Sequence, residues 1–200
     1  MTVSRIKKVL IANRGEIACR IMRTCRDMGI GTVAVCSDPD RNAVFVQQAD
    51  EVVPLGGSQP SESYLRSDLI LAAAAKTGAD AIHPGYGFLS ENADFARQSA
   101  DTGIKFIGHT ADAIASMGSK IEAKRLMMEA DVPILPTIEV ADQSIEAIRG
   151  QLKDLPWPLL IKASAGGGGR GMRIVRDESE LQQALETASQ EAESAFGDGT

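Results

Sequence analysis

Short apolar runs alternate with segments of helical periodicity along the first half of the chain. Turn-forming residues bound each run, and we interpret the runs as strands, at residues 8–12, 32–36, 51–55, 80–83 and 105–108. The segments between them predict helices, at residues 16–28, 43–49 and 64–76 and from about residue 93, where Ser90 or Asn92 caps the helix. Each crossover has room for a single helix, so the strands are parallel and the connections right-handed. The pattern predicts a doubly wound α/β domain over residues 1–115.

The first predicted helix separates apolar from charged positions. Ile17, Ile21 and Cys25 recur at the helical period and predict the face that packs on the sheet. Arg20 and Arg23 fall on the opposite face. The proline in the run at residues 51–55 indicates a strand at the edge of the sheet, because proline cannot donate to a central ladder.

The second half of the chain follows a different order. Two helices divided by Gly118 make up a linking segment over residues 116–133. The later elements are a strand, a helix, a hairpin and a helix, at residues 132–136, 143–153, 159–175 and 179–196. They predict a small α+β lid over residues 134–200. A two-stranded hairpin is marginal alone and the last residues are turn formers, so we expect a lid incomplete at its C-terminus in a piece of a longer protein.

The predicted hairpin carries an unusual tip. Residues 162–172 read KASAGGGGRGM, with consecutive glycines where two turn residues would suffice. Backbone N–H groups in such a loop bind oxyanions, and Lys162 and Arg170 add positive charge. We interpret the loop as a flap over nucleotide phosphates; the alternative is a disordered hairpin tip. It is neither a Walker A loop nor a dinucleotide fingerprint, because no Gly-Lys-Ser/Thr follows and no helix opens there.

Composition argues against several classes of protein. The 200 residues are 44% hydrophobic and 24% charged, and the net charge of −6 argues against a nucleic-acid or anionic-membrane partner. No apolar run approaches the roughly 20 residues of a membrane span. The three cysteines form no close CxxC pair, which fits reduced thiols in a cytosolic or matrix-like compartment, and we expect a cytoplasmic protein. The two histidines belong to no metal-ligand cluster, so no metal site is predicted here.

Three stretches together carry a family resemblance. They are IANRGEIA at residues 11–18, HPGYGFLSENA at residues 83–93 and the glycine loop at residues 162–172. The chain resembles, over essentially its whole length, the amino-terminal part of a biotin carboxylase, the ATP-grasp component of biotin-dependent carboxylases. The string at residues 83–92 is highly specific, whereas the glycine loop alone indicates only an ATP-grasp protein. The implied fold class is α/β, a Rossmann-like parallel-sheet pre-ATP-grasp domain followed by the beginning of an ATP-grasp domain.

The resemblance implies an ATP-dependent ligase. ATP and bicarbonate give carboxyphosphate, and the carboxyl group passes to biotin on a carrier protein or domain. Magnesium accompanies ATP, and a carboxyltransferase subunit is the further partner. The resemblance assigns nucleotide contacts to Lys120, Lys162, Gly168, Gly169 and Met172.

Other positions receive different roles. The resemblance places Tyr86 near the biotin site and puts Arg20 and Arg23 in a homodimer contact of the N-terminal domain. The family's catalytic base and magnesium ligands follow residue 200, so we expect no catalytic or metal-binding residue here and no turnover by this chain alone. Ala165, where some members have glycine, points towards alpha subunits of the propionyl- or methylcrotonyl-CoA carboxylase type.

Simpler interpretations remain for single residues and for the whole chain. Lys120 fits a solvated helix lysine, Tyr86 fits a packing residue, and Arg20 and Arg23 fit a solvated face. Another ATP-grasp ligase, of the carbamoyl-phosphate or purine-synthesis type, shares the domain and the loop but not the string at residues 83–92. A non-catalytic Rossmann-like binding module is the third hypothesis, but no glycine fingerprint follows the first strand.

Overall fold

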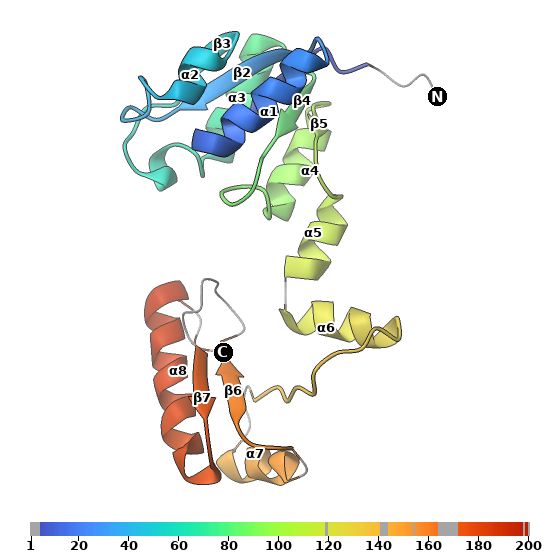
Figure 1. The fold of residues 1–200 in the computed structure, drawn as a ribbon, viewed down its shortest axis with the longest axis vertical. Helices are drawn as coiled ribbons and strands as arrows, with labels where there is room; N and C mark the ends of the chain where they lie inside the picture. Colours follow the sequence, from blue (N-terminus) through green and yellow to red (C-terminus); the bar gives the residue numbers. More distant parts are fainter. Residues whose placement is uncertain are drawn as a thin grey trace. The chain divides into compact units, whose positions relative to one another are not determined.

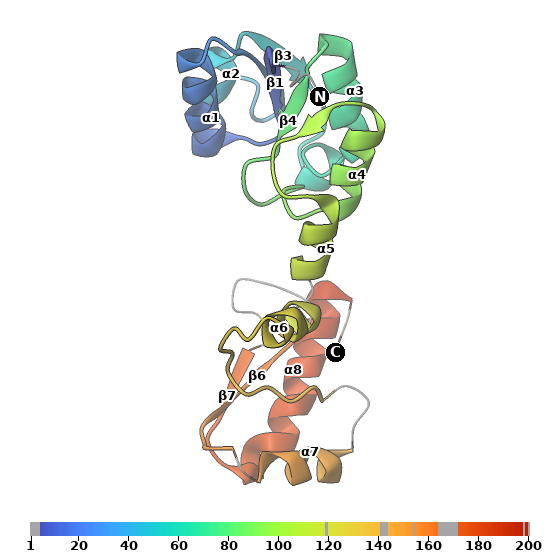
Figure 2. The same cartoon turned by 90° about the vertical axis from the view of Figure 1, so that its right-hand side faces the viewer.

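The structure, a computed structural model, describes residues 5–118, 120–140, 144–153, 155–163, 172–197 and 199. It divides into two compact units, Met1–Ser116 and Met117–Thr200. The first unit is the parallel sheet with its helices, and the second contains the hairpin (Figures 1 and 2).

Five parallel strands form the first unit's sheet, in the order β3-β2-β1-β4-β5. The strands are β1 (Lys8–Ile11), β2 (Gly31–Cys36), β3 (Glu51–Pro54), β4 (Ala81–His83) and β5 (Lys105–Phe106). The helices are α1 (Gly15–Asp27), α2 (Val44–Gln48), α3 (Ser67–Thr77), α4 (Ala93–Asp101) and α5 (Ala111–Gly118). This arrangement confirms the predicted α/β class. The proline-containing strand β3 lies at the edge, as predicted.

Hydrophobic clusters cover both faces of the sheet. Leu10 and Val33 point to the face covered by α3 and α4, whereas Val9 and Ala34 point to the face covered by α1 and α2 (Figure 1). Because neither face meets water, the central strands are apolar at nearly every position, as is usual for parallel sheets. The apolar face of α1 is buried as the helical repeat predicts.

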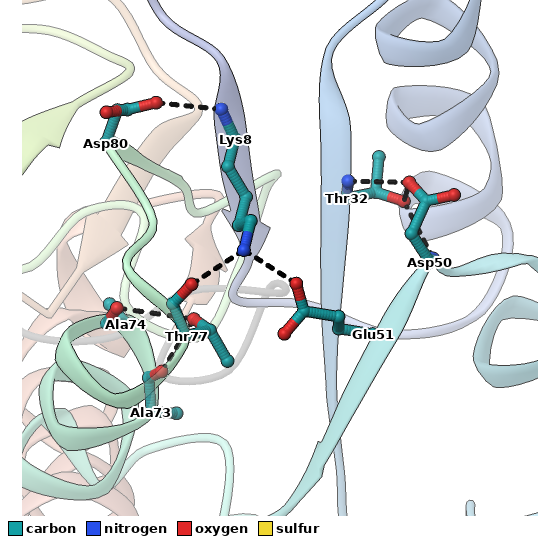
Figure 3. A network of polar contacts seen from close by, with 8 residues as sticks. All are labelled: Lys8, Thr32, Asp50, Glu51, Ala73, Ala74, Thr77 and Asp80. Atoms are coloured by element: carbon teal, nitrogen blue, oxygen red, sulfur yellow. Dashed lines mark hydrogen bonds and ion pairs between the residues drawn. The ribbon is translucent and has the colours of Figure 1, made fainter.

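A polar network lies at the amino-terminal ends of the strands. The Lys8 ammonium donates to Glu51 Oε1 at 2.6 Å and to the Thr77 carbonyl at 2.7 Å (Figure 3). The Asp80 carboxylate accepts the backbone N–H of Lys8 at 2.8 Å, and Asp50 accepts the N–H of Thr32 at 2.8 Å. These contacts join β1 to the starts of β3 and β4 and to the end of α3.

Two helix starts test the sequence-based expectations. The Asn92 side chain accepts the N–H of Phe95 at 2.8 Å and caps α4, which selects Asn92 over Ser90. The predicted helix start at Tyr64 is wrong, because α3 begins only at Ser67, after a 3₁₀ turn at Pro60–Glu62. The Tyr64 ring is buried and stacks on Phe88, so its apolar character serves a long-range contact instead of a helix face.

The second unit holds an antiparallel hairpin backed by helices. Its elements are α6 (Lys120–Glu129), α7 (Ile145–Leu152), β6 (Leu159–Lys162), β7 (Met172–Val175), a 3₁₀ turn (Glu178–Glu180) and α8 (Leu181–Phe196). One hairpin face packs on α7 and α8 through the buried side chains of Ile148, Leu152, Val175 and Leu181. Figure 1 shows α8 lying along the two strands. The predicted hairpin and its flanking helices are confirmed.

The strand predicted from residue 132 is wrong. Residues 132–140 form neither helix nor strand. Pro133 and Pro136 have no N–H to donate, and residues three apart face opposite edges of a strand, so pairing on either edge would lose a bond. Ile138 and Val140 still pack partly against the cluster behind the hairpin. The apolar residues of this segment therefore serve the core without strand pairing.

Candidate functional site

The two sequence motifs of the first unit meet at one place in the sheet. The strand order reverses between β1 and β4, because the chain runs from β1 outward to β3 and then returns to the other side of β1. The loops after β1 and β4 therefore lie together at the carboxyl edge of the sheet. In open α/β sheets, ligands bind at such a switch point.

Asn13 joins these two loops. Its side chain is 3% exposed, and its Nδ2 donates to the carbonyl oxygens of Pro84 at 2.7 Å and Tyr86 at 2.8 Å. Its Oδ1 accepts the N–H of Arg14 at 2.9 Å. Between the two carbonyls, Gly85 adopts φ +68°, and a Cβ there would lie 2.8 Å from Asn13 Nδ2. The backbone of the loop thus rests directly on the amide.

Arg14 contacts the same loop from the side. Its guanidinium carbon lies 5.8 Å from the ring centre of Tyr64 and 6.0 Å from that of Phe88. The two rings stack with their centres 5.1 Å apart. Arg14 also forms an ion pair with Asp40, whose carboxylate is 3.3 Å from the guanidinium. A cation over two stacked rings holds the loop against the turn after β2.

Asp40 organises the polar side of this cluster. Its carboxylate accepts the Tyr64 hydroxyl at 2.6 Å and the Ser37 hydroxyl at 3.1 Å. Burial raises the pKa of Asp40, but hydrogen bonds from Tyr64, Ser37 and Arg14 outweigh burial and hold it below its ordinary value. Burial, with the bond to Asp40, raises the pKa of Tyr64 to about 12. The hydroxyl therefore remains a donor at neutral pH.

Tyr86 stands out from this anchored loop. It is 61% exposed, although its carbonyl is bound by Asn13. His83 Nδ1 accepts the Gly85 N–H at 3.1 Å, and burial, with the charge of Arg20, lowers the pKa of His83. A neutral imidazole can accept this bond, so His83 helps to fix the backbone of the loop that follows β4. Arg20 and Arg23 are exposed on α1.

In the second unit, the outer face of the hairpin combines apolar and basic groups. Leu160 pairs with Ile174 and Lys162 with Met172, so all four side chains share one face. We call this set the hairpin face. Leu160, Ile174 and Met172 are 51%, 60% and 43% exposed, and Lys162 is exposed too. The result is an apolar strip that ends at a lysine.

Other expected site residues are only partly described. Lys120 is the first residue of α6, but its side chain lies outside the described part of the structure. Gly168 and Gly169, with the rest of the loop at 164–171, lie outside it entirely. Within the described ranges no cluster of His, Cys, Asp or Glu is arranged to hold a metal ion. No helix of those ranges is long and apolar enough to span a membrane.

Sequence reasoning missed Asn13 and Asp40. A polar residue directly after a buried strand was the available signal for Asn13, since Ala12 before it is fully buried. No local signal pointed to Asp40, whose partner Tyr64 lies 24 residues away. Both contacts depend on the folded sheet.

Two family models match the chain. The biotin carboxylase, N-terminal domain model matches residues 5–114. The model of the carbamoyl-phosphate synthase L chain, ATP binding domain, matches residues 119–200.

Curated relatives match nearly the whole chain. The methylcrotonoyl-CoA carboxylase subunit alpha, mitochondrial, of Dictyostelium discoideum is 48% identical over 99% of this chain and 28% of its own length. Biotin carboxylase 1 of Bacillus subtilis is 48% identical over 96% of this chain and 43% of its own. The human propionyl-CoA carboxylase alpha chain, mitochondrial, is 51% identical over 96% of this chain and 26% of its own. The chain thus spans less than half the length of each relative.

Solved structures share the fold. The crystal structure of a biotin carboxylase–beta-gamma-ATP complex from Campylobacter jejuni superposes with a TM-score of 0.92 at 46% identity, over 98% of this chain and 44% of that one. The biotin carboxylase domain dimer of the Hydrogenobacter thermophilus 2-oxoglutarate carboxylase, in complex with MgADP, ADP and bicarbonate, gives 0.90 at 46% identity, over 98% and 43%.

Proposed function

This chain belongs to the biotin carboxylase family, and we propose that it supplies part of the ATP site and of the biotin-facing surface of a biotin-dependent carboxylase. The enzyme carboxylates carrier-bound biotin with ATP and bicarbonate, by way of carboxyphosphate. The observation that carries the proposal is the hairpin face, where an apolar strip leads to Lys162 beside the glycine-rich segment.

The hairpin face suits a nucleotide. Leu160, Ile174 and Met172 offer an apolar surface to a flat base, and Lys162 offers a positive charge at the end of that surface. A triphosphate carries roughly four negative charges, which fixed cations and backbone N–H groups compensate best where water is excluded. Lys120, Gly168 and Gly169 complete this proposal as further phosphate contacts. Magnesium would neutralise phosphate charge, but no described residue cluster supplies its ligands.

Tyr86 and α1 face other molecules in this proposal. The exposed Tyr86 ring contributes to the biotin site, and its anchored backbone supports that role. Arg20 and Arg23, exposed on α1, contribute to a homodimer contact of the N-terminal domain. The partners are a biotin carboxyl carrier protein or domain and a carboxyltransferase subunit.

The proposal also covers the domain bounds, the type of carboxylase subunit and the cellular compartment. We divide the chain into a pre-ATP-grasp domain at residues 1–115, linking helices at 116–133 and an ATP-grasp lid at 134–200. The Ala165 position favours an acyl-CoA carboxylase alpha subunit. Cys25 and Cys36, buried free thiols of the first unit, support a reducing compartment such as the cytoplasm.

The test is ADP release by the full-length protein that carries this chain. Release should require both biotin and bicarbonate. Lys162→Ala should lower kcat/KM for ATP at least tenfold, because a hydrogen bond to a charged group contributes about 1.5–3 kcal/mol. Lys153→Ala removes another exposed lysine of the same unit and should retain full activity. ADP release that ignores biotin would replace this proposal with another ATP-grasp ligase.

A further inference from the structure

We propose that Asn13 is a positioning residue for Tyr86, which it holds in place for biotin without touching biotin itself. The inference rests on the proposed biotin-facing role of Tyr86. It assigns a function to the first residue of the NRGE turn.

Asn13 extends the pairing of β1 with β4 beyond the end of the strands. The last backbone bond of that ladder runs from the Ala12 N–H to the His83 carbonyl at 2.9 Å. Beyond it, the Asn13 side chain takes over as donor, to the carbonyl oxygens of Pro84 and Tyr86. The side-chain amide thus replaces the backbone N–H as the hydrogen-bond donor between the two segments. It fixes the position of the loop after β4 relative to the end of β1.

All polar atoms of the Asn13 amide are used. Each Nδ2 hydrogen has its own carbonyl acceptor, and Oδ1 accepts the Arg14 N–H. The side chain is nearly inaccessible, so loss of its bond to Pro84 would leave a buried carbonyl unsatisfied. Asparagine is therefore required chemically: aspartate of the same shape has no hydrogen to donate and would place negative charge against two carbonyl oxygens.

The fit is also steric. A Cβ on Gly85 would lie 2.8 Å from Asn13 Nδ2 and 3.1 Å from a side-chain carbon of Ile17. The loop backbone thus packs against the amide and against α1, with no room for a longer amide such as glutamine. Beyond Tyr86, the Phe88 ring stacks on Tyr64. The loop is held on both sides of an exposed ring.

Holding the backbone of Tyr86 has a direct consequence for binding. An exposed aromatic ring on a mobile loop loses conformational entropy when a ligand orders it. A ring on a fixed backbone avoids most of that cost, and the reacting groups stay aligned. A misplacement of about 1 Å lowers rates as much as a hundredfold in positioned reactions. Asn13 therefore affects the use of biotin much more than the use of ATP.

The experiment measures biotin- and ATP-dependent kinetics of the full-length protein, with free biotin as the acceptor. Asn13→Asp should raise KM for biotin about tenfold or more and leave KM for ATP within about twofold. Thr32→Val is the matched control, since it breaks a partly buried polar contact of a buried residue at the opposite end of the strands and should leave both KM values unchanged. An equal rise of both KM values for Asn13→Asp would overturn the proposal.

A double-mutant cycle separates positioning from general damage. If Asn13 acts through Tyr86, Asn13→Asp should add nothing to the biotin defect of Tyr86→Ala. If the double variant instead raises KM for biotin by the product of the two single effects, Asn13 acts independently of Tyr86 and the inference is overturned. Should Asn13→Asp fail to fold, Asn13→Ser, which is uncharged, takes its place in the same cycle.

A structural readout keeps this inference distinct from the proposed function. Amide hydrogen exchange of Gly85 and Ser90, whose N–H groups are hydrogen-bonded to His83 Nδ1 and to the Gly87 carbonyl, should accelerate at least tenfold in the Asn13 variant of the ligand-free protein and remain unchanged in Thr32→Val. Unchanged exchange would overturn the positioning role. If Tyr86→Ala leaves KM for biotin unaltered while exchange responds as expected, the biotin role of Tyr86 fails, and with it the functional part of the inference.

Discussion

The Tyr64 hydroxyl donates a 2.6 Å hydrogen bond to the carboxylate of Asp40. The same oxygen accepts the backbone N–H of Ser37 at 3.2 Å. One buried tyrosine, whose ring stacks on Phe88, thereby ties the segment before α3 to the turn that follows β2. Arg14, whose N–H is bonded to Asn13 Oδ1, pairs with Asp40 and so joins this cluster to the Asn13 contact.

Tyr64→Phe should lower the free energy of unfolding by about 1.5–3 kcal/mol, because it removes a donor to a charged, partly buried carboxylate. The urea midpoint of the first unit's transition measures this loss. Tyr86→Phe removes a hydroxyl from an exposed ring and should change stability by less than about 0.5 kcal/mol. Equal midpoints for the two variants would contradict the interpretation of the Tyr64–Asp40 bond.

Gly85 and Gly87 offer a matched pair of substitutions. Both have positive φ, +68° and +67°, so alanine costs about 1 kcal/mol of backbone strain at either position. Only at Gly85 would the new methyl group meet Asn13 and Ile17, whereas nothing lies within 4 Å at Gly87. Gly85→Ala should therefore destabilise the protein by at least about 1 kcal/mol more than Gly87→Ala in urea unfolding. Similar losses would mean that the loop does not rest on the amide.

Acid should weaken the amino-terminal ends of the strands. Hydrogen bonds from the Thr32 hydroxyl and N–H lower the pKa of Asp50, and the backbone N–H groups of Lys7 and Lys8 lower that of Asp80. A carboxyl whose folded pKa is depressed stabilises the protein above its unfolded pKa of about 3.9. This stability is lost as pH falls through the folded value.

The urea midpoint between about pH 6 and pH 2 tests this expectation. The unmodified chain should lose stability towards the acid end, and Asp80→Asn should lose less over the same range. Thr32→Val, which removes one donor to Asp50, should also reduce the acid-dependent loss. An Asp80→Asn profile parallel to that of the unmodified chain would refute the contribution of Asp80.

Alanine substitutions at two neighbouring residues of β7 should affect different properties, one the stability of the second unit and the other the KM for ATP. Val175 is fully buried against α7 and α8, so Val175→Ala should cost about 2 kcal/mol of stability, measured by urea unfolding of the second unit. Ile174 lies on the hairpin face, and Ile174→Ala should cost less than about 0.5 kcal/mol. In the full-length protein, Ile174→Ala should instead raise KM for ATP several-fold, and an unchanged KM would remove Ile174 from the proposed nucleotide site.

The sheet and the hairpin were predictable because buried strands are short apolar runs that can be recognised in the local sequence. Both sheet faces are covered, so β1 and β2 appear as continuous apolar runs, and the positions of the strands follow directly. The strand predicted after residue 132 failed because apolar character does not guarantee a ladder. Pro133 and Pro136 remove donors that no run of hydrophobic residues can replace.

The candidate site was less predictable, since its contacts join distant parts of the sequence. Family resemblance pointed to Tyr86 and Lys162, but the residues that anchor Tyr86 have no local signature. Asn13 and Pro84 are 71 residues apart, and Asp40 and Tyr64 are 24 apart. Hydrophobic periodicity describes which side of an element is buried and contains no information about which side chain meets which carbonyl.

The separation of Asn13 from its acceptors also sets an order of events during folding. Closing a loop of this length costs entropy that only the pairing of β1 with β4 offsets. The amide reaches the two carbonyls only once those two strands have met. A nascent or partly unfolded chain consequently lacks the ordered loop. Order in the loop around Tyr86 thus depends directly on the pairing of β1 with β4.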